Sequence, residues 1–435
     1  MEEALKDPEE VKEISFYFDD ITVLPESVLR LTSLEAITID RCPKLNLKQA
    51  IGVLSKLPHL QSFAYNHNDL ANLPADISNL KDITELALVD NKLVTLPASI
   101  LKLEHLQKLN LSENLSLDFV QTFDLLSKAG SLRQLVLEQN KLSDLSINLT
   151  KMVQLDDLLL GNNHFTDVPE QVKGMPLKYL DLSSNMLELL NIRKGDLAQL
   201  TGINLDQNEI RELPPELLLL PNLRKVSLLG NLIATIPKWI KSVKGLQEMD
   251  LSSNVLTELP AELSQLPNLR ELILSGNHLT AGGLEPLFDM PWLTRLELHR
   301  NDISYIDPKV ENLANLKELD IGNNPLVKLP VEFSQLKNLV TLSAGILPRL
   351  AWNDTFAILA QLPRLSKLSA FYNGFGKIPD GLLKLGQVHY FVINGNGFDK
   401  DEKDKLTNTF PNAEIVFKKL PLTSKPLHQW RYSKS

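Results

Sequence analysis

The sequence predicts an α/β solenoid. This is a curved, horseshoe-shaped stack of about seventeen coils, each giving one strand to a concave parallel sheet, with extended, 3-10 or short helical segments on the convex side. Three observations predict it. Leucine recurs at a fixed spacing along most of the chain, aromatic residues make up only 6% of it, and one string of about 23 residues is repeated many times. Such a period indicates one small unit stacked on copies of itself.

The repeated string is clearest in the copy that begins at Leu246, and its general form is LxxLxLxxNxLxxLPxxIxxLxx. Its LxxLxL part alternates as a strand does, so Met249 and Leu251 should point inward and Asp250 outward. The later Leu-Pro pair favours an extended back side, because proline fixes φ and disfavours helix at the preceding residue. Copies covering residues 11–412 begin at Val11, Leu34, Leu60, Ile83, Leu106, Leu132, Leu155, Leu177, Leu200, Leu223, Leu246, Leu269, Leu293, Leu316, Leu339, Leu365 and Val388.

An asparagine follows the strand in nearly every copy. Its amide both donates and accepts, so it can satisfy backbone groups that are buried between coils. The exceptions are Asp19, Cys42 and Leu347. We expect the Cys42 thiol to be buried and inert, and the backbone near Leu347 to be irregular. The predicted ladder consists of Asn68, Asn91, Asn114, Asn140, Asn163, Asn185, Asn208, Asn231, Asn254, Asn277, Asn301, Asn324, Asn373 and Asn396.

This pattern resembles the leucine-rich-repeat family, and the resemblance spans more than nine-tenths of the chain. The LPxxIxxL form is similar to that of bacterial leucine-rich-repeat proteins and of the intracellular Ras-suppressor and Scribble/Erbin groups. The resemblance implies a horseshoe fold. It says much less about function, because the family is defined by its architecture.

Three copies depart from the pattern in the same way. Those that begin at Leu34, Leu106 and Leu339 run to 26 residues and lack Leu-Pro at the usual place. Their apolar residues recur at i and i+3, which predicts a short amphipathic helix on the convex side of each. The 24-residue copy at Leu269 is a candidate for the same change.

A solenoid needs caps at its ends, because each coil buries its core only against its neighbours. We expect a helical cap over residues 1–10 that opens at Asp7 and Pro8, and the solenoid over 11–412. Asp399 and Glu402 fit a capping box for a helix that runs to about Phe410. A strand over 413–417 should close the sheet, and 418–435 is a basic tail.

Composition excludes several functional classes. One cysteine cannot build a disulfide framework or a cluster of cysteine metal ligands. The net charge of −9 argues against binding nucleic acid through its phosphates, and no apolar run is long enough for a membrane span. We find no phosphate-binding loop, no HExxH and no G-x-S-x-G motif. The sequence therefore predicts no enzyme activity, no cofactor and no metal site.

The candidate site consists of outward side chains on the concave strands. Acidic residues accumulate there, and lateral neighbours would lie about 5 Å apart, so a basic partner segment could neutralise them. An ordinary solvated acidic surface, partly balanced by Arg295 and Arg300, is the competing interpretation, and a metal site is disfavoured because a flat sheet spreads its oxygens. Val136, Leu159 and Ile273 are apolar positions on the same face. The partner-binding candidates are Asp181, Asp206, Glu248, Asp250, Glu271, Glu297, Glu318, Asp320, Phe371 and Tyr390.

We therefore expect a monomeric, non-catalytic module that binds a protein partner along its concave sheet. One alternative is a regulatory subunit of a GTPase- or phosphatase-type signalling assembly, as the resemblance to Ras-suppressor-like proteins implies. Another is an exported bacterial surface protein that interacts with a host. The acidic start predicts a cytoplasmic protein, or an exported one if an N-terminal signal was removed.

Overall fold

The computed structural model describes residues 4–18 and 20–418, and Asp19 and the basic segment 419–435 lie outside the described residues. The chain packs as two compact units. The first unit comprises Met1–Ile210 and Pro214–Asn231, and the second comprises Arg211–Leu213 and Leu232–Ser435. Each predicted copy supplies one strand, and the closing segment supplies one more.

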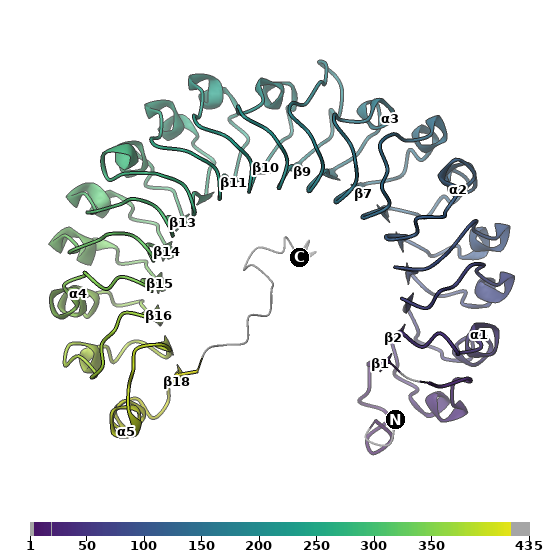
Figure 1. Cartoon of the computed structure of the whole chain (residues 1–435), viewed down its shortest axis with the longest axis horizontal. Helices are drawn as coiled ribbons and strands as arrows, with labels where there is room; N and C mark the ends of the chain where they lie inside the picture. The colour runs from purple at the N-terminus through teal and green to yellow at the C-terminus, as the bar shows by residue number, and fades with distance from the viewer. Residues whose placement is uncertain (1–3, 19, 419–435) are drawn as a thin grey trace. The chain divides into compact units, whose positions relative to one another are not determined.

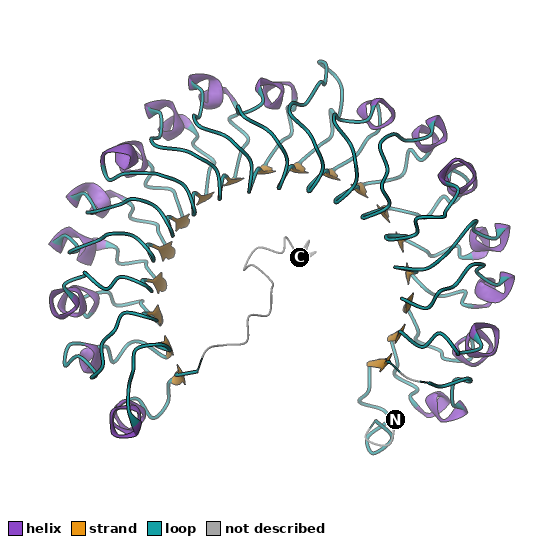
Figure 2. Cartoon of the chain, in the orientation of Figure 1, coloured by secondary structure: helices purple, strands orange, loops and turns teal. Residues whose placement is uncertain are grey.

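Every strand pairs in parallel with the strands of the neighbouring coils of its unit. In each unit the strands lie on one side of the coils, and the helices lie on the opposite side (Figures 1 and 2). The strands of the first unit are β1 (Glu13–Tyr17), β2 (Ala36–Asp40), β3 (Ser62–Asn66), β4 (Glu85–Ala87), β5 (Lys108–Asn110), β6 (Gln134–Val136), β7 (Asp157–Leu159), β8 (Tyr179–Asp181), β9 (Gly202–Asn204) and β10 (Lys225–Ser227). Those of the second are β11 (Glu248–Asp250), β12 (Glu271–Ile273), β13 (Arg295–Glu297), β14 (Glu318–Asp320), β15 (Thr341–Ser343), β16 (Lys367–Ser369), β17 (Tyr390–Val392) and β18 (Glu414–Val416).

The opposite side consists mainly of five-residue 3-10 helices that begin just after a proline. The 3-10 helices of the first unit are η1 (Glu26–Arg30), η2 (Ala75–Asn79), η3 (Ala98–Lys102), η4 (Ile147–Lys151) and η5 (Pro215–Leu219), and this side also has the one-turn helix α3 (Glu170–Lys173). Those of the second unit are η6 (Lys238–Ser242), η7 (Ala261–Gln265), η8 (Gly282–Asp289), η9 (Pro308–Asn312), η10 (Val331–Gln335) and the three-residue η11 (Leu382–Lys384).

The three 26-residue copies form α-helices as predicted: α1 (Leu47–Leu54), α2 (Phe119–Leu126) and α4 (Trp352–Leu359). Each of these helices is amphipathic and buries its apolar face. The 24-residue copy differs, because its segment is the eight-residue 3-10 helix η8, which contains Pro286. Proline lacks the N–H that an α-helix interior requires.

The asparagine ladder is confirmed. Asn277 is typical, since its amide donates to the Leu251 and Leu274 carbonyls (2.9 and 3.0 Å) and accepts from the Leu256 N–H (2.9 Å). The residue before each ladder position has a positive φ, for example 51° at Ser253 and 58° at Ile346. The backbone turn is therefore the same in coil after coil.

The irregularity expected at Leu347 is not found. Its N–H donates to the Asn373 side chain of the next coil (2.6 Å), and the Trp352 indole donates to its carbonyl (3.3 Å). Ile346 donates to the Phe371 carbonyl (2.9 Å), as other residues at this turn position do to the next coil. The next coil's asparagine thus keeps the turn, although Leu347 has no polar side chain of its own.

The cap predicted at the N-terminal end is not found among the described residues, whereas the helix predicted near the C-terminal end is present. Residues 4–10 form turns rather than the predicted helical cap, with one hydrogen bond from Glu10 N–H to the Asp7 carbonyl (3.1 Å). So short a segment cannot offset the cost of nucleating a helix. At the other end α5 (Lys400–Thr409) begins as predicted, because the Asp399 side chain accepts from the Glu402 N–H (2.9 Å). The Glu402 carboxylate accepts from the Ile378 N–H instead of closing the capping box.

Candidate functional site

Strand register places the outward side chains of the second unit in two rows. One row holds Glu248, Glu271, Arg295, Glu318, Thr341, Lys367, Tyr390 and Glu414. The second holds Asp250, Ile273, Glu297, Asp320, Ser343, Ser369, Val392 and Val416. Six of the ten candidate residues therefore lie on the neighbouring strands β11 to β14.

Arg295 is the centre of these rows. Its guanidinium donates to Glu297 (2.6 Å) and lies 3.9 Å from Glu271 and 3.7 Å from Glu318. Burial alone would lower the pKa of Arg295, but the hydrogen bond to Glu297 and the charges of Glu318 and Glu271 outweigh burial and raise it. We name these four residues the Arg295 cluster. Its net charge is −2, so the strip is less acidic than a count of its carboxylates implies.

The aspartates at the strand ends have a structural role that the sequence analysis missed. Asp320 accepts from the Gly322 N–H (2.9 Å), and Asp250 accepts from the Ser252 N–H (2.8 Å) and hydroxyl. In the first unit Asp181 accepts in the same way from Ser183 (2.8 Å). An aspartate that bonds a backbone N–H two residues later terminates a strand by an Asx-type turn. Asp250 is only 1% exposed, so little of it is open to a partner.

A polar chain extends this arrangement along the first unit. Asn204 donates to the second Asp181 oxygen (3.0 Å) and accepts from the Asp206 N–H (3.0 Å). Asp206 in turn accepts from the Ser227 hydroxyl and from the Leu229 N–H (2.8 Å). Burial raises the pKa of Asp181, and the bonds from Ser183 and Asn204 oppose that rise. Asp181 and Asp206 thus link neighbouring coils.

Glu138 is the residue of the first unit that sequence reasoning overlooked. Burial raises the pKa of its carboxyl to about 7, helped by the nearby charges of Asp181 and Glu113. Between its coil and that of Asp181 stands Gly161, where a Cβ would lie 3.0 Å from the Ser183 hydroxyl. The repeat spacing could have identified Glu138 as a candidate, because it occupies the next outward position after Val136 in the copy that begins at Leu132.

The apolar outward positions divide between the units. Val136 and Leu159 are register partners on β6 and β7, and both are partly exposed. Ile273, expected on the same surface, is 5% exposed and so adds little to it. Val136 and Leu159 are thus an adjacent apolar pair in the first unit, and the second unit has partly exposed Val392 and Val416 in its own row.

The aromatic candidates do not form one patch. Phe371 lies over Gly345, where a Cβ would be only 2.5 Å from its ring, and it meets Tyr372 edge-on with centroids 6.1 Å apart. Tyr390 is in a different row, between Lys367 and Glu414. The described residues show no ring contact between Tyr390 and either of the other two. Phe371 fills the space above a glycine, and Tyr390 stands apart.

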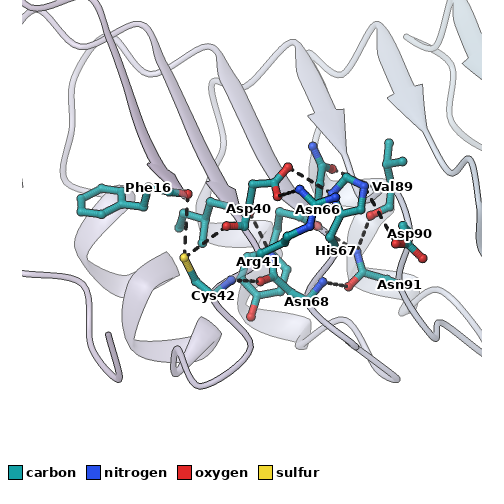
Figure 3. Close-up of polar contacts among 12 residues, drawn as sticks. Phe16, Asp40, Arg41, Cys42, Asn66, His67, Asn68, Val89, Asp90 and Asn91 are labelled. Atoms are coloured by element: carbon teal, nitrogen blue, oxygen red, sulfur yellow. Dashed lines mark hydrogen bonds and ion pairs between the residues drawn. The ribbon is translucent and has the colours of Figure 1, made fainter. Parts of the chain in front are cut away.

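A second polar cluster, which we did not anticipate, lies on the first coils (Figure 3). The Asp40 carboxylate accepts from Arg41 (3.0 Å) and meets the His67 ring nitrogen (3.0 Å), and Arg41 lies 4.9 Å from the Phe18 ring centroid. Cys42 is fully buried, as predicted, and its N–H donates to Asn68 (2.6 Å). The cluster joins side chains of neighbouring coils, since Asp40 and His67 are 27 residues apart in the sequence.

Two further findings concern metal-ligand groups and membrane-spanning helices. Residues 4–18 and 20–418 contain no group of three or more His, Cys, Asp or Glu side chains placed to hold a metal ion. Within those same ranges the helices are too short or too polar for any of them to traverse a bilayer.

Comparisons with known proteins agree with this architecture. A family model described as leucine rich repeat matches residues 221–279 and 291–345. A leucine-rich-repeat protein of Leptospira interrogans is similar over 96% of this chain and 98% of its own, with a TM-score of 0.58 and 26% identity. An internalin of Listeria monocytogenes shares the fold at a TM-score of 0.52 and 21% identity, over 73% of this chain and 89% of its own.

Curated relatives match in sequence over parts of their length. An adenylate cyclase of Schizosaccharomyces pombe is 26% identical over 70% of this chain, and a leucine-rich repeat serine/threonine-protein kinase of Mus musculus is 29% identical over 48%. The matched segments span only 18% and 11% of those proteins. What is shared is the repeat architecture, and the family-model match together with the similar solved structures supports a leucine-rich-repeat family for this chain.

Proposed function

We propose that this chain is a non-catalytic module that binds a protein partner on the inner faces of its sheets. The inner face of each unit is the strand side, which carries the two rows of outward side chains. The leucine-rich-repeat fold commonly mediates protein–protein interaction. The observation that carries the proposal is the strand register, which places partly exposed side chains of several chemistries in continuous rows on neighbouring strands. Because these side chains are already ordered, a partner loses less entropy on binding them.

The second unit offers the charged part of this surface. Glu271 and Glu318 are 38% and 53% exposed, and each lies within 4 Å of Arg295. A basic partner side chain that approached the Arg295 cluster would meet its net charge of −2. We therefore propose a partner segment that carries lysine or arginine, and such a contact would be sensitive to salt.

The first unit offers an apolar part. Val136 and Leu159 lie side by side in register, and Glu138 follows Val136 on the same strand end. A large apolar side chain of the partner could cover both residues. Aromatic and arginine side chains are the usual anchors at such positions.

Charge reversal tests the proposal. Glu248→Lys, Glu271→Lys and Glu318→Lys together change the inner row by six charges and spare the aspartates that end strands. The control Glu262→Lys, Glu311→Lys and Glu332→Lys makes the same change on the 3-10 helices of the opposite side. Crosslinking and pull-down from the source organism would first identify the partner.

Calorimetry of that partner then decides. We expect the inner variant to lose at least about tenfold in affinity and most of its salt dependence, while the control keeps both. Equal affinity in the two variants, with circular dichroism showing both folded, would rule out the inner face as the binding surface.

A regulatory role in a signalling assembly is the second candidate. It is favoured by the sequence similarity to segments of an adenylate cyclase and of a serine/threonine-protein kinase. A pull-down that returns a GTPase, kinase, phosphatase or cyclase would select this role, whereas a structural or surface protein would select a plain scaffold. The cytoplasmic location stays a prediction, as does the exported alternative.

A further inference from the structure

The first strand of the first unit has an open hydrogen-bonding edge. β1 pairs with β2 over five residues, from Glu13 with Ala36 to Tyr17 with Asp40. Its other edge meets no strand among the described residues. Most strands of both units are three residues long, so β1 presents an unusually long edge for this chain.

The hydrogen bonds to β2 fix which residues face that edge. The Lys12 carbonyl accepts from the Ala36 N–H (3.0 Å), and the Phe18 N–H donates to the Asp40 carbonyl (3.1 Å). Alternate residues of a parallel strand bond the same neighbour, so Ile14 and Phe16 face β2. Glu13, Ser15 and Tyr17 therefore direct their N–H and carbonyl groups outward, and residues 4–18 and 20–418 supply no hydrogen bond to them.

Nothing in the turn at residues 4–10 covers this edge with hydrogen bonds. The one backbone hydrogen bond within that turn is internal, from Glu10 to Asp7. Tyr17 is 57% exposed and Phe18 is 74% exposed. Unpaired strand edges beside exposed aromatic residues are sites where another strand adds.

The last strand of the second unit cannot supply a matching edge. The Glu414 N–H donates to the His389 carbonyl, and the Val416 carbonyl accepts from the Ile393 N–H, so both residues face β17. Only Ile415 of β18 (Glu414–Val416) directs its backbone groups outward. A head-to-tail contact from β18 to β1 would leave most of the open edge unpaired.

A second copy of β1 does match it. We propose that two copies of this chain form a two-fold symmetric dimer in which β1 pairs antiparallel with itself, with Ser15 opposite Ser15. The three outward residues are spaced evenly about Ser15, so every outward N–H and carbonyl of the strand can find a partner. An isologous contact of this kind closes on itself and does not propagate into fibres.

The side chains of this register are compatible with the pairing. Glu13 lies opposite Tyr17, Ile14 opposite Phe16, and Lys12 opposite the exposed Phe18. No like charges face each other, and such pairs would destabilise antiparallel strands. The dimer goes beyond the proposed partner binding, and it replaces the monomer expected from the sequence.

Two-fold symmetry at Ser15 allows a charge-swap experiment on the full chain. Ser15 is exposed, so Ser15→Lys and Ser15→Glu should both fold. Sedimentation velocity from about 1 to about 200 µM should show monomer and dimer in exchange for the unchanged chain. Each variant alone places like charges face to face and should dimerise roughly tenfold more weakly or worse. An equal mixture of the two should dimerise again.

Proline substitution provides an independent measurement. Ser15→Pro removes both central hydrogen bonds of the symmetric pair, yet leaves the bonds to β2, which come from the alternate residues. We expect it to weaken the dimer by roughly 30-fold, while Ser15→Ala, which keeps its N–H, does not. Circular dichroism would confirm that both variants fold.

Three results would overturn the dimer. The first is a chain that stays monomeric over the whole concentration range. The second is a dimer that Ser15→Pro leaves unchanged. The third is a mixture of the Ser15→Lys and Ser15→Glu variants that is no more dimeric than either variant alone. None of these readouts involves the partner, so failure of the dimer and failure of the proposed binding role are distinguishable.

Discussion

The inner faces of the two units hold partly buried carboxylates in different ways. In the second unit the guanidinium of Arg295 lies within 4 Å of Glu271, Glu297 and Glu318. In the first unit, over the part of the chain that is described, Glu138 has no ion pair, and burial raises its pKa to about 7. An arginine balances the acids of the Arg295 cluster, whereas Glu138 depends on a proton, and Asp181 on hydrogen bonds from neutral groups.

This difference shows that formal charge along a strand row is a poor measure of the charge a partner meets. The three glutamates around Arg295 carry their own cation. Glu138 has none beside it, and it loses its proton near neutral pH. The Arg295 cluster should therefore respond mainly to salt, and Glu138 mainly to pH.

Removing the cation should give the largest effect. Arg295→Met leaves Glu271, Glu297 and Glu318 without it, and we expect a loss of about 2 kcal/mol in unfolding free energy, smaller in high salt because repulsion is screened. Urea denaturation at two salt concentrations measures this. Arg300→Met is the control, because Arg300 is exposed and forms no ion pair with any described residue. Equal losses in both variants would mean that the cluster contributes nothing specific.

Removing the unbalanced acid should give an intermediate effect of opposite sign. Because the folded-state pKa of Glu138 lies above its unfolded value, its contribution to stability is lost as pH rises from about 4.5 to about 7. Glu138→Gln should therefore stabilise the chain by roughly 1 kcal/mol at pH 8 and by almost nothing at pH 4. Thermal melts across this range would test it, with exposed Glu188→Gln as control. A gain that did not vary with pH would contradict the assignment.

Replacing a strand-ending aspartate should give the smallest effect. Asp320→Asn keeps the oxygen that accepts from the Gly322 N–H, so we expect a change within about 0.5 kcal/mol. Asp320→Ala removes the acceptor and should cost about 1 kcal/mol. The chain already contains the exchange, because Asn110 accepts from the Ser112 N–H and Asn204 from the Asp206 N–H. If Asp320→Asn were as costly as Asp320→Ala, the charge of Asp320 would be what matters.

Repeat spacing predicted most of the fold, because each coil buries the same positions. Copy starts, the asparagine ladder and the helices of the 26-residue copies all follow from periodicity. The failures lie where one segment acts alone. The turn at residues 4–10 is too short for a helix, and η8 is shaped by Pro286.

The site was less predictable, because outward residues are chosen by neighbours on other coils. Spacing placed Glu271, Arg295 and Glu318 in one row, but only the side-chain distances reveal that Arg295 forms ion pairs with both glutamates. The sequence predicts Asp181 as a partner contact, although its oxygens are occupied by Ser183 and Asn204. A search for Asp or Asn two residues before Ser or Gly at a strand end would have identified this role.

The asparagine ladder limits how such a chain can change its length. Most ladder amides accept from the preceding coil and donate to its carbonyls, and many also donate to a carbonyl of their own coil, as Asn277 and Asn324 both do. The buried side-chain oxygen of Asn114 is an exception, because it accepts no hydrogen bond from the described residues. A whole coil added or removed within a unit presents its new neighbours with the same donors and acceptors. Part of a coil does so only if the extra residues avoid the ladder, and α1, α2 and α4 place theirs on the opposite side. Duplication of whole coils is therefore compatible with the asparagine ladder, and the extra residues of the longer coils lie on the helical side.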